Sequence, residues 1–94
     1  MERLENELAA HSPEDLDETP ETLGTRASIA LLKGDFELAV TFLRRALETA
    51  PSDANLWSDL AAAYLEEARH SRDASLEVDA LEAALEALEL EAGH

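Results

Sequence analysis

The chain has 94 residues, enough for one small domain, and 46% of them are hydrophobic. These are mostly Ala and Leu, which favour helices, and only 4% of the chain is aromatic, so the composition predicts an all-α fold. The formal net charge of −15 disfavours nucleic acid and anionic lipid and favours basic partners, although such a charge also serves solubility alone.

The sequence lacks cysteine, a secretory signal and a membrane-spanning stretch, and each absence argues against a kind of site or a location. The sequence has no cysteine, which excludes disulfides and cysteine-based metal or catalytic sites. The first residues lack the basic start and apolar run of a secretory signal. No apolar stretch approaches the roughly 20 residues that cross a bilayer. We therefore expect a cytoplasmic protein without a membrane partner.

An acidic lead segment is predicted over residues 1–19. Leu4 and Leu8 lie four residues apart, which predicts a short helix over 3–10. From residue 1 to residue 21 there are eight acids against Arg3 alone. We expect this segment to precede the main domain, which would span residues 20–94.

Four longer helices follow, predicted over residues 20–33, 36–49, 54–70 and 76–91. The first begins at Thr19-Pro20-Glu21, where a capping residue, a proline at the first helical position and an acid near the positive end of the dipole occur together. Gly34 ends it, and Pro51 forces the turn before the third helix. The second has the clearest apolar stripe: Phe36, Ala39, Val40, Leu43, Ala46 and Leu47.

The spacing of large and small residues repeats along the chain. One stretch reads Trp57-x2-Leu60-Ala61-x2-Tyr64, and an earlier one reads Gly34-x-Phe36-x2-Ala39-x3-Leu43-x2-Ala46, ending at Pro51. This pattern resembles the tetratricopeptide repeat, a 34-residue helix–turn–helix unit. The stretch from Trp57 to Leu65 is also similar to repeat segments of large bacterial multidomain proteins, some of which carry a caspase-like (CHAT) domain.

The resemblance implies about two antiparallel helix–turn–helix repeats, with repeat one over residues 20–53 and repeat two over 54–91. Three departures stand out. Arg26 occupies a slot that is usually large and apolar, and Leu23 replaces the signature Trp. The first helix of repeat two is extended, since about seven extra residues lie around residues 66–73 if Ala80, Ala84 and Ala87 fill the core slots of the last helix. An extended turn is expected near residues 66–75. That helix places Leu81, Ala84, Leu85 and Leu88 on one side and Glu82, Glu86 and Glu89 on the other.

In tetratricopeptide folds the first helices of the pairs line a concave groove, which carries the expected partner-binding surface. On this alignment the surface comprises Glu21, Gly24, Ser28 and Leu31, then Asn55, Ser58, Ala62 and Leu65. It lacks the Lys, Asn and Arg set with which some such domains hold a terminal carboxylate. A peptide bearing Arg or Lys suits its acidic rim better.

Candidate chemical sites have simpler explanations. Trp57 and Tyr64 lie seven residues apart on one helical face and are interpreted as core residues rather than a stacking pair. His11, His70 and His94 are too scattered for a helical metal site. We therefore expect no metal, no cofactor and no enzyme activity, but a protein–protein interaction scaffold. The alternative is a structural module that forms homo-oligomers and binds no peptide.

Overall fold

The computed structural model of the chain describes residues 18–93. It places four helices in these residues: α3 (Pro20–Leu32), α4 (Phe36–Thr49), α5 (Ala54–Ser71) and α6 (Ala74–Ala92). No strand occurs among the described residues, and none of the four helices is long and apolar enough to cross a bilayer. The short helix expected over residues 3–10 lies outside the described part of the chain.

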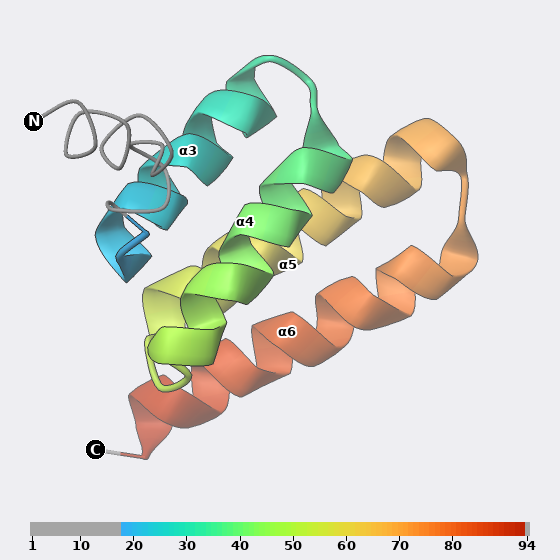
Figure 1. The fold of residues 1–94 in the computed structure, drawn as a ribbon. Helices are drawn as coiled ribbons and strands as arrows, with labels where there is room; N and C mark the ends of the chain where they lie inside the picture. Colours follow the sequence, from blue (N-terminus) through green and yellow to red (C-terminus); the bar gives the residue numbers. More distant parts are fainter. Residues whose placement is uncertain (1–17, 94) are drawn as a thin grey trace, which may run out of the picture.

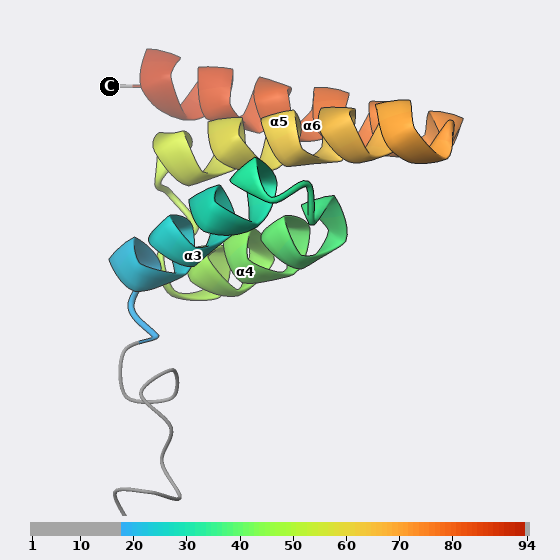
Figure 2. The ribbon, with the colours of Figure 1, turned by 90° about the horizontal axis from the view of Figure 1, so that it is seen from above.

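Successive helices run antiparallel and form two hairpins, α3 with α4 and α5 with α6 (Figure 1). The second hairpin lies across the first, so the molecule has two layers, and α5 packs against both α4 and α6 (Figure 2). This arrangement confirms the all-α, helix–turn–helix fold predicted from the sequence.

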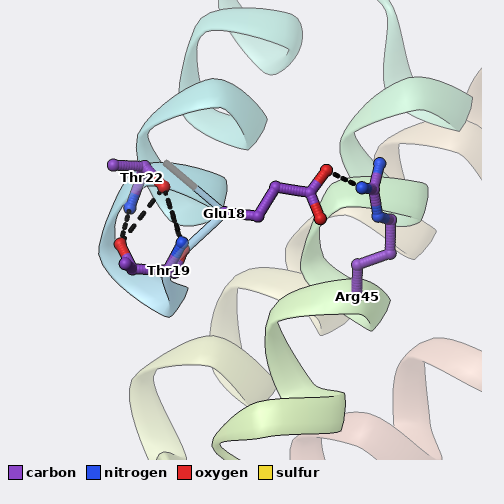
Figure 3. A network of polar contacts seen from close by, with 4 residues as sticks. All are labelled: Glu18, Thr19, Thr22 and Arg45. Atoms are coloured by element: carbon purple, nitrogen blue, oxygen red, sulfur yellow. Dashed lines mark hydrogen bonds and ion pairs between the residues drawn. The ribbon is translucent and has the colours of Figure 1, made fainter. Parts of the chain in front are cut away.

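The start of α3 is fixed by a small polar network (Figure 3). The Thr22 backbone N–H donates to the Thr19 hydroxyl at 3.2 Å, and the Thr19 backbone N–H donates to the Thr22 hydroxyl at 3.0 Å. These two bonds form a reciprocal capping box that satisfies backbone donors at the helix start. Just before it, the Glu18 carboxylate pairs with the Arg45 guanidinium of α4, which ties this end of the first hairpin together.

The turn between α3 and α4 depends on a glycine. Gly34 has φ of +80°, a conformation that side chains with a Cβ rarely adopt. This geometry lets the Asp35 N–H donate to the Ala30 carbonyl at 2.8 Å and the Gly34 N–H donate to the Leu31 carbonyl at 3.0 Å. The free carbonyls at the end of α3 are thereby satisfied, as the stop signal at Gly34 predicts.

The turn after α5 is shorter than the sequence predicts. The helix predicted over residues 54–70 is present as α5, which continues to Ser71, so the turn comprises only Arg72 and Asp73 rather than the extended turn expected near residues 66–75. The Ser71 hydroxyl donates to the Glu67 carbonyl at 2.8 Å in the last turn of α5. Arg72 ends the helix in the left-handed region, with φ of 56°, and the Asp73 carboxylate accepts from the Ser75 N–H at 3.0 Å to start α6.

The core is built largely from alanine and leucine, contributed by all four helices. The stripe predicted on α4 is confirmed, since five of its six residues are buried and Phe36 is half-buried. Small residues at the helix contacts allow close approach of the axes: Ala27, Ala39, Ala46 and Ala63 are exposed by 1% or less. Trp57 and Tyr64 are half-buried and pack against this cluster, which fits their interpretation as packing residues.

The face of α6 that packs inward differs from the expected one. The buried residues are Ala80, Ala83 and Ala87, so Ala83 takes the slot predicted for Ala84. The leucine side of this helix faces solvent, with Leu81 61% exposed. The alanine side lets α6 lie close along α5, where a row of leucines would need more room.

Candidate partner-binding site

The groove predicted between the first helices of the two hairpins is present, between α3 and α5. Its volume is about 380 Å³. The wall from α3 consists of Pro20, Glu21, Gly24, Thr25 and Ser28, and the opposite wall of Asp53, Leu56 and Asp59. At the floor the two helices come close, since a Cβ placed on Gly24 would lie 3.8 Å from a methyl of Leu56.

The sequence-predicted surface residues are only partly brought together. Glu21 and Ser28 line this groove, as does Gly24. Leu31 instead packs against the core cluster. Four others on α5 do not line the groove: Asn55, Ser58 and Ala62, which are exposed, and Leu65, which is 41% exposed. A role in binding for all eight predicted residues stays a prediction.

Two acids of the groove were missed by the sequence reasoning. Asp53 caps α5, since its carboxylate accepts from the Asn55 N–H at 3.0 Å, and it also lines the groove. Asp59 lies three residues after Leu56, and this spacing places both on the helical face that lines the groove. Because the predicted α5 positions do not line the groove, the repeat alignment gives no signal for Asp59.

The charged side chains that line the α3–α5 groove are all acidic. Its lining contains three carboxylates, Glu21, Asp53 and Asp59, and no basic side chain. Burial raises the pKa of Asp59 above its ordinary value of 3.8, and the negative charge of Asp53 raises it further. A cation placed between these carboxylates would relieve their mutual repulsion. Within residues 18–93, no three potential ligand side chains are arranged to hold a metal ion.

A second, larger groove of about 510 Å³ lies between α4 and α6, over α5. Trp57 and Tyr64 form its aromatic floor, and the Trp57 indole N–H is occupied, since it donates to the Pro51 carbonyl at 2.8 Å. The charged residues around it are Arg44 and four acids: Glu48, Asp79, Glu82 and Glu86. Burial raises the pKa of Tyr64, the charges of Asp79 and Glu67 add to this, and Arg44 opposes it.

The two grooves differ in whether a basic side chain already neutralises their carboxylates. In the larger groove Arg44 already stands among the acids and interacts with the Tyr64 hydroxyl. In the α3–α5 groove no base is present to neutralise the three carboxylates. The α3–α5 groove is smaller, but its negative charge is not neutralised by any basic side chain in its lining, so it favours a cationic ligand more strongly than the α4–α6 groove does.

Comparison with known proteins connects this fold to a family. A model of the tetratricopeptide repeat family matches residues 20–65, just under half of the chain, from the start of α3 into α5. This family is a repeat scaffold that generally mediates protein–protein interaction and has no catalytic role of its own. No curated protein and no solved structure is significantly similar to the chain.

Proposed function

We propose that this chain, whose residues 20–65 match the tetratricopeptide repeat family, is an interaction module that binds a basic protein segment in the groove between α3 and α5. The observation that carries the proposal is the lining of that groove, which has three carboxylates and no base. A positively charged segment would complement this lining, and complementary charge favours both specificity and the rate of encounter.

The chemistry of the groove favours lysine or arginine over other ligands. Both side chains combine a long apolar stem with a charged end, so the stem can lie along Leu56 and Gly24 while the charge reaches the carboxylates. A bound cation would stabilise the charged form of Asp59 in particular, because burial and the charge of Asp53 disfavour that form. A bound cation would therefore lower the pKa of Asp59 as it binds.

Self-association is the second candidate function. Large apolar side chains are exposed on outer surfaces, with Leu32 on α3 88% exposed and Leu81 on α6 61% exposed. Exposed apolar side chains of this kind can be covered by another copy of the chain. The net charge of −15 opposes that contact at neutral pH, so we rank a basic partner ahead of it.

The wider context also belongs to the proposal. We expect a cytoplasmic scaffold without catalytic activity, cofactor, nucleic-acid ligand or membrane ligand, since the strong negative charge repels polyanions. The likeness of Trp57 to Leu65 to repeat segments of large bacterial multidomain proteins, some with a CHAT domain, stays a prediction about architecture.

A random peptide library panned against the whole protein tests the binding proposal without a known partner. We expect the retained peptides to be enriched in Lys and Arg and to lose affinity as salt rises. In Ser28→Lys a cation occupies the groove, so these peptides should bind at least about tenfold more weakly, which corresponds to about 1.4 kcal/mol. Isothermal titration measures the affinity of each peptide for each variant.

Thr41→Lys is the matched control, because Thr41 is likewise exposed on a helix but lies on α4, outside this groove. It adds the same charge and should leave affinity nearly unchanged. Equal losses in Ser28→Lys and Thr41→Lys would show that only net charge matters. Retention of no peptide, or of peptides without Lys and Arg, would contradict the proposal outright.

A further inference from the structure

The face of α6 that points away from the core carries a row of large apolar side chains. Val78, Leu81, Leu85 and Leu88 are 56%, 61%, 49% and 59% exposed, and we call these four residues the outer seam. They are spaced by three, four and three residues, which is the a/d spacing of a coiled coil. Scattered exposed leucines are ordinary on a protein surface, but a continuous row on one helix marks an interaction surface.

The outer seam cannot turn inward within this fold. Ala80, Ala83 and Ala87 on the opposite side are 7% or less exposed and fill the contact with the rest of the protein. Rotating α6 to bury the leucines would place bulky side chains where only methyl groups fit, and such overpacking destabilises a core. The four large side chains therefore stay available for a helix that is not part of the described chain.

The charges beside the outer seam define what that helix must carry. In the heptad frame with Val78 and Leu85 at a, the flanking e and g positions hold Glu82 and Glu89, then Glu77, Ala84 and Glu91. Residues 74–92 as a whole contain six acids and no base. A helix that docks here meets an apolar strip with carboxylates on both sides.

We propose that the outer seam of α6 binds an amphipathic helix from another protein, with apolar residues at heptad spacing and Lys or Arg beside them. The apolar residues would interlock with the leucines, and the bases would pair with the glutamates at the e and g positions. This surface is separate from the α3–α5 groove, so the inference does not depend on what that groove binds.

Charge also argues against the two occupants that the chain itself could supply. If two copies paired through their outer seams, glutamate would face glutamate in either orientation, because parallel helices match e with g and antiparallel helices match e with e and g with g. Residues 1–17 contain six acids and one base, Arg3, so they too would meet like charge. A basic helix avoids this repulsion.

The probe for this test is a fluorescent peptide of about four heptads, with Leu at a and d and Lys at e and g. Two matched peptides accompany it: one with Glu in place of every Lys, and one with the same composition in scrambled order. The full chain should bind the Lys peptide at least about tenfold more tightly than either matched peptide, measured by fluorescence anisotropy. Equal binding of the scrambled peptide would overturn the proposal, because charge alone would then explain it.

Variants of the full chain locate the contact. Leu81→Gln with Leu85→Gln should weaken binding of the Lys peptide at least about tenfold. Ile29→Gln with Leu32→Gln is the matched control, because it replaces two exposed apolar residues on α3; it should leave binding unchanged. Both pairs replace exposed side chains, and circular dichroism checks that each variant folds. Equal binding to the two pairs would overturn the assignment to α6.

Two further measurements separate the competing occupants. Sedimentation at neutral pH should give a monomer, and a dimer that Leu81→Gln with Leu85→Gln abolishes would replace the basic helix by a second copy. Leu4→Gln with Leu8→Gln should leave peptide affinity unchanged, and a large gain in affinity would mean that the lead segment occupies the outer seam. Ser28→Lys should not affect this contact, so failure of the groove proposal and failure of this one are distinguishable.

Discussion

The helices α4 and α6 are the second helices of their hairpins, yet they pack in opposite ways. α4 buries large and small residues together, among them Val40, Leu43 and Leu47, and leaves mainly polar residues outside. α6 buries only alanines and exposes Leu81, Leu85 and Leu88. The difference shows that a helical period identifies an apolar face but does not decide which of two apolar faces enters the core.

The neighbours of each helix explain the difference. α4 packs against both α3 and α5, so side chains of two sizes can fill the space around it. α6 contacts α5 along its length, and its alanines let the two backbones approach (Figure 1). Because α6 forms one edge of the stack, its outer side has no partner among the described helices.

The largest expected effect in this comparison comes from Leu43→Ala on α4. Leu43 is 1% exposed, so its removal leaves a cavity and should lower the free energy of unfolding by about 2–5 kcal/mol. Leu85→Ala on α6 makes the same change at a residue that is 49% exposed and should cost less than about 1 kcal/mol. Urea denaturation of both variants measures the two losses. Similar losses would mean that α6 is packed through its leucine side.

A second comparison concerns neighbouring alanines of α6. Ala83→Leu inserts a large side chain at a residue that is 2% exposed, and we expect a loss of about 1–3 kcal/mol from overpacking. Ala84→Leu makes the same substitution one position along, at a half-buried residue, and should cost clearly less. Thermal denaturation followed by circular dichroism ranks the two. A larger loss in Ala84→Leu than in Ala83→Leu would mean that Ala84 faces the core, as the sequence predicts.

Arg26→Met on α3 should have a smaller effect, and in the opposite direction, because we expect it to raise the free energy of unfolding. The Arg26 Nη1 atom is buried and has no hydrogen-bond partner in the described part of the chain. An unsatisfied buried donor costs roughly 1–3 kcal/mol, so Met, which keeps the long apolar stem, should raise the free energy of unfolding by about 1 kcal/mol. Arg26→Lys is the control, because it keeps the charge and should bring no gain. Destabilisation by Met would show that the guanidinium has a partner in the folded protein.

The smallest effect is the pH dependence that Asp59 contributes. Its pKa is higher in the folded chain than its ordinary value of 3.8, so the folded state holds this proton more tightly than the unfolded state. The contribution of Asp59 to stability is therefore present at low pH and is lost as pH rises through its folded pKa. In Asp59→Asn the decline of stability above pH 3.8 should be shallower. A steeper decline, measured by urea denaturation across this range, would contradict the assigned direction.

The sequence predicts the fold better where signals are local. Thr19 and Gly34 act through adjacent backbone groups, and the helix start and the turn at these residues are as expected. The inward side of α6 depends instead on the shape of α5, which no local pattern contains. The short turn at Arg72 has a similar cause, because this residue adopts a left-handed conformation without the glycine that usually signals it.

The candidate site follows the same rule. Glu21 and Ser28 follow from the repeat alignment, because the first helix of the pair starts where the capping signal places it. On α5 the predicted positions do not line the groove, and Leu56 and Asp59 do so instead. A shift of one residue in the rotation of a helix changes which side chains face its neighbour, and only the three-dimensional packing determines that rotation.

The most direct test of the central claim is a titration of the isotope-labelled full chain with a Lys-rich peptide from the panning experiment, followed by nuclear magnetic resonance. We predict that the backbone amides of Gly24 and Ser28 shift together and saturate, while the indole N–H of Trp57 in the α4–α6 groove stays unchanged. Shifts confined to the Trp57 indole and its surroundings, with Gly24 and Ser28 unaffected, would contradict a basic segment bound between α3 and α5.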